Sequence, residues 1–379
     1  MSQIEVSQAT GRRERNAFIK FPWRIYRNDP AWVPPLIIER KAFLDRKRHP
    51  FYKHGDAALF LARSRNRGNE IVGRIMASDD PKYNALHQSN VGCFGLFECI
   101  DDRNVAAALF EAAADWLRKK GRTEMMGPID YSTNYVCGLL IDGFQFPPTV
   151  LTAHNPPYYA PLIESYGFTK AKDWFAWWFS EYPEATARLR KIAIARAGKH
   201  GVTIRPVNLR EIQAEGERLR VIYNQAWEKN WGFVPFTEAE FEHLAREMKP
   251  LIVPQGTLIA EIGDEPVGFI IGVPDINVAL RHINGRLTWF GLPIGLLKLL
   301  YYRTKIRTGR LVALGVVEKY RRAGIAEMLV LQLMDEAFKR WFTGELSMTL
   351  EDNFLINRFI EALGAAKYKT YRIYGKSIG

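Results

Sequence analysis

The sequence predicts an α/β protein with mixed sheets, built from two successive domains that share one order of elements. The chain has 379 residues, whereas one domain usually takes about 150. Apolar residues make up 47% and charged residues 25% of the chain, which is typical of folded globular proteins. Strand and helix patterns alternate through the first half and then recur in the second.

Apolar spacing and turn residues place the elements of the first half. We expect helices at 12–27, 37–46 and 104–120, a short segment at 158–166, and strands at 57–62, 70–77, 91–98 and 173–179. A polar turn at 65–69 joins the first strand pair, and a glycine- and proline-rich loop covers 127–148. The predicted first domain therefore spans residues 1–182.

An arginine-rich linker helix is expected at 183–200, followed by a second domain over 201–379. In that domain we expect strands at 202–206, 258–262, 266–273, 310–317, 345–350 and 367–374, and helices at 209–228, 237–248, 324–341 and 356–363. Thr237 and Glu240 have the spacing of a helix capping box. The order of elements repeats although the residues scarcely do.

Charge and cysteine content narrow the class of protein. The N-terminus has no apolar segment after its first charges, so we expect a cytoplasmic protein. Three cysteines without a C-x-x-C motif predict reduced thiols and no metal site. A net charge of +12 favours anionic partners, but the basic residues are dense only at 281–322. This distribution favours a local anion site over a nucleic-acid surface.

The most informative stretch joins the apolar strand at 311–317 to a basic, glycine-bearing turn that opens a helix. The N–H groups at the start of a helix attract anions, and small residues let a phosphate approach the main chain. Two arginines add full positive charges. The candidate anion-binding residues are Arg321, Arg322, Ala323, Gly324, Ile325 and Ala326.

This stretch resembles motif A of the GNAT N-acetyltransferase superfamily, in which R/Q-x-x-G-x-G/A binds the pyrophosphate of CoA. Arg321, Gly324 and Ala326 occupy the three signature positions. The resemblance implies two tandem GNAT-like domains, an acyl-CoA co-substrate and no metal. It also implies that main-chain groups of Leu314 and Val316 bind the pantetheine arm.

The following elements resemble motif B, a strand, an asparagine and a short helix, and Asn353 matches the asparagine. The tyrosine that many members use as general acid falls at Ile360, so Tyr368, Tyr371 or water would take that role. Two carboxylates that follow the strand are candidate bases, although a solvated turn explains them equally well. They are Glu351 and Asp352.

The first domain has the same order of elements without the motif, since Asp101 and Asp102 precede its helix. These carboxylates would repel a pyrophosphate. We therefore expect a degenerate domain that binds no CoA and either contributes to the acceptor pocket or stabilises the pair.

Large aromatic side chains lie between two helices of the second domain, in a loop that covers the acceptor site in the GNAT fold. A packed helix corner explains this composition equally well. The candidate pocket residues are Trp227, Asn230, Trp231 and Phe233.

Residues 287–302 form an apolar insertion with basic flanks, too short for a bilayer span of about 20 residues. Peripheral contact with an anionic membrane, a cover over a lipid substrate, a buried connecting helix and a homodimer contact are all compatible with it.

The predicted function is acyl-CoA-dependent N-acyl transfer, with acetyl as the expected group, by direct attack of an amine in a ternary complex. The acceptor is expected to be a small-molecule or lipid-like amine, with no nucleic acid. Two alternatives stay open: a Fem-type transferase that uses aminoacyl-tRNA, and a CoA-binding scaffold without catalysis.

Overall fold

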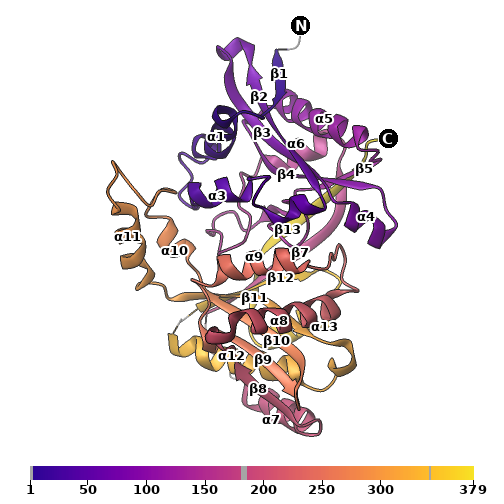
Figure 1. Ribbon diagram of the computed structural model, residues 1–379, viewed down its shortest axis with the longest axis vertical. Helices are drawn as coiled ribbons and strands as arrows, with labels where there is room; N and C mark the ends of the chain where they lie inside the picture. The colour runs from indigo at the N-terminus through magenta and orange to yellow at the C-terminus, as the bar shows by residue number, and fades with distance from the viewer. Residues whose placement is uncertain (1–2, 181–185, 341–342) are drawn as a thin grey trace. The chain divides into compact units, whose positions relative to one another are not determined.

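The computed structural model describes residues 3–180, 186–340 and 343–379, and the chain divides into two compact units (Figure 1). Unit 1 comprises Met1–Trp174, Ala279–Leu300 and Lys369–Gly379. Unit 2 comprises Phe175–Val278 and Tyr301–Tyr368. Each unit has a hydrophobic core of its own.

Unit 1 is built around one sheet with strand order β1-β2-β3-β4-β5-β13, and β6 also pairs with β13. The β4–β5 pair is parallel, whereas β1–β2, β2–β3, β3–β4, β5–β13 and β6–β13 are antiparallel. Its strands are β1 (Ile4–Gln8), β2 (Asp56–Ser64), β3 (Glu70–Asp79), β4 (Val91–Cys99), β5 (Glu124–Gly127), β6 (Leu139–Asp142), the first part of β7 (Thr169–Phe179) and most of β13 (Ala366–Ser377). Its helices are α1 (Arg12–Lys20), α2 (Pro22–Ile25), α3 (Ile37–Phe43), α4 (Pro81–His87), α5 (Arg103–Lys119), α6 (Tyr159–Ser165) and the 3₁₀ turns η1 (Pro50–Lys53) and η2 (Arg65–Arg67).

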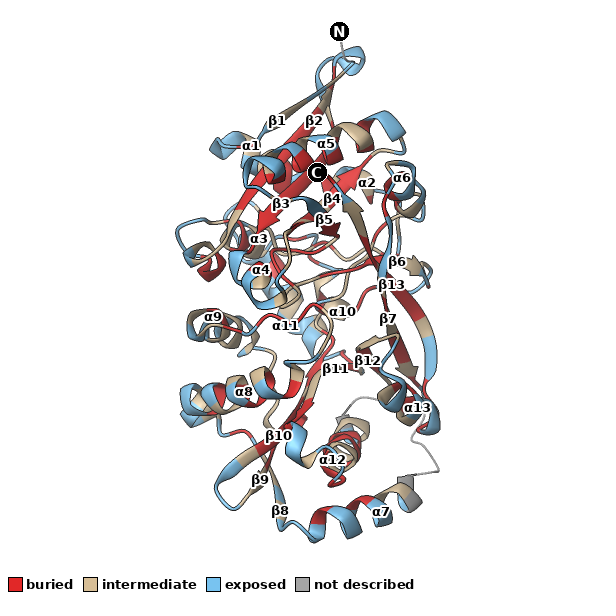
Figure 2. Ribbon diagram, turned by 90° about the vertical axis from the view of Figure 1, so that its right-hand side faces the viewer, coloured by how far each residue is buried: buried red, intermediate tan, exposed pale blue. Residues whose placement is uncertain are grey.

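Side-chain alternation along β2 divides the core of unit 1 between the two faces of its sheet. Phe60 and Ala62 pack in the cluster that contains α5 and α6. Leu59 and Leu61 pack in the opposite cluster with residues of α1 and α3. The sheet is therefore covered on both faces, and Figure 2 shows its strands as mostly buried.

Unit 2 has the strand order β8-β9-β10-β11-β12, with β7 beside β12. Its strands are β8 (Val202–Pro206), β9 (Thr257–Ile262), β10 (Glu265–Pro274), β11 (Thr308–Val316) and β12 (Thr343–Leu350). Its helices are α7 (Thr186–Gly198), α8 (Ile212–Trp227), α9 (Glu238–Met248), α12 (Ile325–Arg340), α13 (Phe354–Ala362) and the 3₁₀ turns η3 (Leu209–Glu211), η4 (Pro254–Gly256) and η5 (Glu318–Tyr320). Two helices, α10 (Asn277–Leu280) and α11 (Ile294–Arg303), each have residues in both units.

Helices α8 and α12 cover opposite faces of the unit 2 sheet (Figure 2). The α-carbons of Gly268 and Gly272 in β10 face Ile325 and Leu333 of α12, whereas Gly315 in β11 faces Ala226 of α8. The glycines allow both helices to lie close to the strands. A cavity of about 50 Å³ remains between α12 and the sheet.

The predicted α/β class and most of the predicted elements are confirmed, including the capping box of α9. The helix expected at 12–27 is divided, because Pro22 begins a separate short helix. The prediction did not include β1, β5, β6 or α4. Strands β5 and β6 have four residues each, too few for a clear alternation. Residues 183–185 of the expected linker helix and Trp341 lie outside the described residues.

Candidate functional site

In unit 2, β11 leads through η5 into a turn at 321–324 that opens α12. Gly324 has a left-handed backbone (φ 78°), and a Cβ there would lie 3.0 Å from the carbonyl oxygen of Ala193 in α7. Glycine is therefore required at this position by both backbone conformation and packing. Gly324, Ile325 and Ala326 present the N–H groups at the start of the helix, where no intrahelical acceptor exists. Such a turn can hold a phosphate.

The two arginines of the turn have different surroundings. The guanidinium of Arg321 donates to the carbonyl oxygen of Ala226 (2.6 Å) at the end of α8. Arg322 is exposed, and Ala323 beside it is buried. Arg321 thus joins the turn to α8, while Arg322 remains directed to solvent.

Strands β11 and β12 separate beside this turn. Their parallel register runs from Thr308 paired with Thr343 to Leu311 paired with Leu346, and both strands continue beyond it. On its other side β11 stays paired with β10 as far as Val316. The main chain of residues 312–316 therefore has an open edge toward β12.

Leu314 and Val316 direct their main-chain groups to that open edge. Trp227 donates its indole N–H to the carbonyl oxygen of Leu314 (3.1 Å), and Val317 donates its N–H to Val267 of β10 (2.9 Å). Because backbone groups alternate in direction along a strand, Val316 points away from β10 as Leu314 does. A ligand that entered the open edge could pair with both residues.

A buried ion pair holds the closed end of this separation. Arg310 in β11 and Glu345 in β12 are 5% and 1% exposed, with Nε and Oε1 3.4 Å apart. The hydroxyls of Ser347 and Tyr368 also donate to Glu345. The pair therefore links β11 to β12 one position before their register ends. Tyr368, one candidate acid, is engaged in this cluster, while Tyr371 is buried in unit 1.

The loop after α8 lies against the turn. Lys229 pairs with Glu318 (2.7 Å), and Trp227 contacts the ring of Tyr223 (4.6 Å between centroids). Asn230 and Trp231 are half-buried, whereas Phe233 packs inside the core. The four pocket candidates thus differ in access: Trp227, Asn230 and Trp231 are partly accessible, and Phe233 is not.

Glu351 and Asp352 form the turn after β12, half-buried and exposed respectively. Asn353 caps α13, its side chain accepting from the N–H of Ile356 (3.5 Å). Parallel β11 and β12 end at the same edge of the sheet, so these three residues lie at the edge where the Gly324 turn begins. Ile360, at the position of the family tyrosine, is buried.

Unit 1 fills the corresponding helix start with its own carboxylate. The side chain of Asp102 accepts from the N–H groups of Asn104 and Val105 (2.8 and 3.4 Å) at the start of α5. These amides are the groups that an anion would need. Asp102 thus caps the start of α5, whereas repulsion of a pyrophosphate by the two aspartates stays a prediction.

Unit 1 also fills the separation between its parallel strands. The β4–β5 register ends where Cys93 pairs with Met126. Beyond it, Ile129 donates its N–H to the carbonyl oxygen of Phe94 (2.7 Å), and Leu96 donates its N–H to Asp130 (3.0 Å). The chain itself therefore occupies the edge that stays open in unit 2.

Asp130 makes this filled edge sensitive to pH. Burial raises the pKa of Asp130 to about 6, above about 3.9 in an unfolded chain. The folded unit thus binds more protons between these values, and the stability contributed by protonation is lost as the pH rises through 6. We expect Asp130→Asn to exceed wild type by about 1–3 kcal/mol in free energy of unfolding at pH 7 and to match it at pH 4. Denaturant titrations at both values test this, and parallel pH dependences would contradict it.

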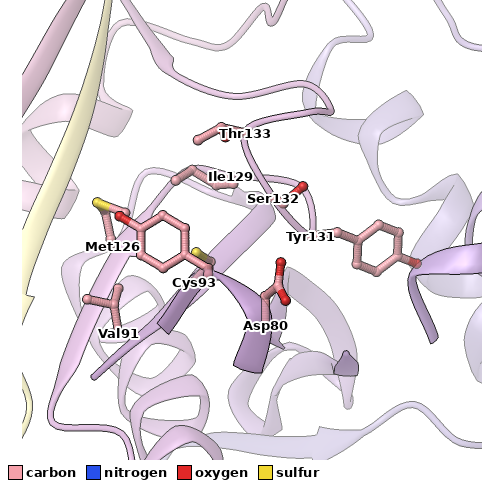
Figure 3. Close-up of a pocket in the computed structure, with 9 residues that line it drawn as sticks. Asp80, Val91, Cys93, Met126, Ile129, Tyr131, Ser132 and Thr133 are labelled. Atoms are coloured by element: carbon pink, nitrogen blue, oxygen red, sulfur yellow. The ribbon is translucent and has the colours of Figure 1, made fainter. Parts of the chain in front are cut away.

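Unit 1 also contains a pocket, but its side chains do not form a catalytic arrangement. Figure 3 shows Asp80, Cys93 and Tyr131 among its lining side chains. Burial raises the pKa of the Cys93 thiol to about 12, so it is no nucleophile at neutral pH. Asp80 caps α4 by accepting from the N–H of Lys82 (3.0 Å). Within residues 3–180, 186–340 and 343–379, no group of three His, Cys, Asp or Glu side chains could hold a metal ion.

Sequence reasoning did not identify the Arg310–Glu345 pair, the contact of Trp227 with Leu314 or the filled edge of unit 1. A charged residue at each start of two neighbouring apolar strands is the one signal that could have indicated the pair. The other two depend on contacts between segments far apart or on main-chain groups, which leave no mark in residue patterns.

Comparisons with known proteins agree with this geometry. Residues 216–365 match the acetyltransferase (GNAT) family. Protein YghO of Escherichia coli is 38% identical over 375 residues, covering 97% of this chain and 94% of that protein. A bacterial ceramide synthase of Caulobacter vibrioides is 36% identical over 377 residues, covering 96% and 95%.

Among solved structures, a tandem GNAT protein from the clavulanic acid biosynthesis pathway aligns with a TM-score of 0.57 and 13% identity over 99% of each chain. A GCN5-related glucosamine N-acetyltransferase region of a fungal multi-domain enzyme aligns with a TM-score of 0.56 and 12% identity, covering 99% of this chain and 38% of that one. At these identities the similarity concerns the fold.

Proposed function

Because the chain belongs to the acetyltransferase (GNAT) family and has a tandem GNAT fold, we propose that it is an acyl-CoA-dependent N-acyltransferase with one acyl-CoA site, in unit 2. One contrast carries the proposal. Unit 2 has an open strand edge beside the Gly324 turn, whereas unit 1 fills both equivalent places with its own residues.

The residues of unit 2 fit the parts of an acyl-CoA molecule in sequence. The N–H groups of 324–326, with Arg321 and Arg322, would hold the pyrophosphate. Main-chain groups of Leu314 and Val316 would pair with the amides of the pantetheine arm along the open edge. Asn353 lies at the edge where the turn begins and would contact the same arm.

The proposed reaction needs no covalent intermediate. The acceptor amine, once neutral, attacks the thioester carbonyl, the C–S bond breaks, and CoA leaves as a thiolate that takes up a proton. A main-chain N–H near Val316 would stabilise the negative charge on the carbonyl oxygen. Binding both reactants in the correct orientation at one sheet edge would account for most of the rate enhancement.

We propose a long-chain amine as acceptor. The Caulobacter relative is named as a ceramide synthase, and a ceramide is the amide of a fatty acid with a long-chain amino alcohol. The half-buried Trp227, Asn230 and Trp231 offer aromatic surface and one amide for such a ligand.

The acyl chain could extend into the cavity between α12 and the sheet. The Arg310–Glu345 pair, at the closed end of the β11–β12 separation, forms part of its lining. Apolar side chains and glycines line most of it, among them Gly309, Leu311, Leu333, Met334 and Leu346. This lining supports an acyl group longer than acetyl.

The test is formation of an amide. The purified protein is incubated with a long-chain acyl-CoA and a long-chain amino alcohol, and the products are measured by mass spectrometry together with free CoA thiol. We expect amide and thiol in equal amounts. Failure to form amide with any amine, while the folded protein binds acyl-CoA, would favour the scaffold alternative.

Glu351 and Asp352 are the proposed bases, and their removal has a specific expected effect. Glu351→Gln/Asp352→Asn should lower kcat about 100-fold. It should leave the Kd for acyl-CoA within about twofold, because the loss concerns proton transfer from the amine. Steady-state kinetics and calorimetry measure both quantities. An unchanged kcat would assign the two carboxylates to the turn and remove them from the mechanism.

A further inference from the structure

The insertion at 287–302 is exposed in the structure, so the expectation of a buried connecting helix is wrong. It consists of a tight loop and α11 (orange, at left in Figure 1). The ring of Phe290 is 99% exposed and Leu297 is 62% exposed. The other exposed large apolar side chains of this segment are Leu292, Ile294, Leu296, Leu300 and Tyr301.

The exposed apolar side chains of α11 gather on one side of the helix. At 3.6 residues per turn, Leu296, Leu297 and Leu300 share one side, while Gly295 is buried on another. Lys298 and Arg303 fall on the two borders of the apolar stripe. Leu299 and Tyr302, on other sides of the helix, are half-buried, so α11 is apolar around most of its surface and exposes one apolar side to solvent.

The base of the insertion is fixed to the rest of unit 1. Trp23 donates its indole N–H to Asn284 (2.6 Å), and Ile37 donates its N–H to the carbonyl oxygen of Gly285 (3.0 Å). Leu296 donates its N–H to the carbonyl oxygen of Leu287 (2.9 Å), which closes the loop. The exposed apolar groups are therefore presented by an ordered support.

All charged side chains around the insertion are positive. Residues 276–317 contain no Asp or Glu. None of the exposed basic residues here pairs with a carboxylate in the described part of the chain, and several donate to main-chain carbonyls instead. These basic residues are Arg281, Arg286, Lys298, Arg303, Lys305 and Arg307.

We infer that this insertion docks the protein on the surface of a bilayer that contains anionic phospholipids. Apolar side chains would enter the boundary between headgroups and acyl chains, while the surrounding cations would contact lipid phosphates. No helix among the described residues is long and apolar enough to cross a bilayer. The charge favours an anionic lipid surface over a second copy of this chain, because the same basic patch would then face itself. The inference does not depend on the proposed catalysis.

Vesicle sedimentation with the full chain, without any acyl-CoA, tests the inference. Wild type should bind vesicles of phosphatidylcholine and phosphatidylglycerol more tightly than phosphatidylcholine alone, and less tightly as salt rises. Phe290→Asp/Leu297→Asp should bind at least about 10-fold more weakly. The matched control Leu86→Asp/Leu355→Asp introduces the same charges at exposed apolar positions elsewhere and should bind within about twofold of wild type.

A second variant separates charge from apolar contact. Lys298→Glu/Arg303→Glu keeps the apolar stripe and should lose the preference for anionic vesicles. Three results would overturn the inference: wild type that does not sediment, Phe290→Asp/Leu297→Asp that binds like wild type, or a wild-type dimer that this variant converts to monomer without weakening vesicle binding.

Discussion

Replacing Gly324 with glutamate should abolish acyl-CoA binding, with an affinity loss of about 1,000-fold or more. Three effects combine. The left-handed backbone (φ 78°) disfavours a side chain, the Cβ would press on Ala193 of α7, and the new carboxylate would lie at the proposed phosphate site. Calorimetric titration of the variant with acyl-CoA measures the loss.

The matched control is Gly263→Glu, in the β9–β10 turn. Gly263 is also left-handed (φ 60°) and has open space around its α-carbon, so the variant adds the same charge without a clash. It should bind acyl-CoA like wild type. Since Gly324→Glu could also disturb α7, the exposed Arg322 provides a milder test, and Arg322→Glu should weaken binding about 10- to 100-fold. Wild-type affinity in a folded Arg322→Glu protein would mean that the turn does not hold the phosphates.

Glu345→Ala should lower the free energy of unfolding of unit 2 by about 3–5 kcal/mol, because it leaves the buried Arg310 without its carboxylate. The tyrosine and serine hydroxyls that donate to Glu345 would also lose their acceptor. Chemical denaturation followed by tryptophan fluorescence measures the change.

The double replacement Arg310→Met/Glu345→Leu is the control for the pair. Apolar side chains of similar size often replace a buried ion pair at little cost, so this variant should recover most of the stability lost in Glu345→Ala. If Glu345→Ala unfolds like wild type, the pair does not hold β11 to β12. A double variant as unstable as Glu345→Ala would assign the loss to the hydroxyl contacts.

Local patterns were sufficient for the fold class and most elements, because the longer helices and strands of both units are regular, but not for short elements such as β5 and β6. The strand at 311–317 is a continuous apolar run that ends at a charged turn, and the helix after Gly324 has apolar residues at helical spacing. The turn between them carries its own chemical signature. The left-handed backbone at Gly324 was not predicted, because glycine also occurs at ordinary strand positions such as Gly268 and Gly315.

The sequence did not predict that the gap between the parallel strands is open in unit 2 and filled in unit 1. Nothing about Ile129 or Asp130 indicates that their main-chain and carboxylate groups enter the edge of β4. The two aspartates before α5 predicted that unit 1 binds no pyrophosphate, and the structure shows that Asp102 caps the helix. Charged residues can be located directly in the sequence. The contact of a strand edge with a segment more than 30 residues away cannot.

The sequence also did not predict whether the apolar segment 287–302 is buried or exposed. Apolar composition is compatible with both a buried helix and a docking surface, and the structure separates the two, because Gly295 packs inward and Leu297 is exposed. Composition alone favoured burial, since apolar residues are usually inside.

Titration of the wild-type protein with acetyl-CoA and with a longer-chain acyl-CoA tests the central claim most directly. The account predicts one molecule bound per chain, with the longer chain bound more tightly, because unit 2 has the open edge and unit 1 has filled its own. Absence of binding by both thioesters, or two molecules bound per chain, would contradict it.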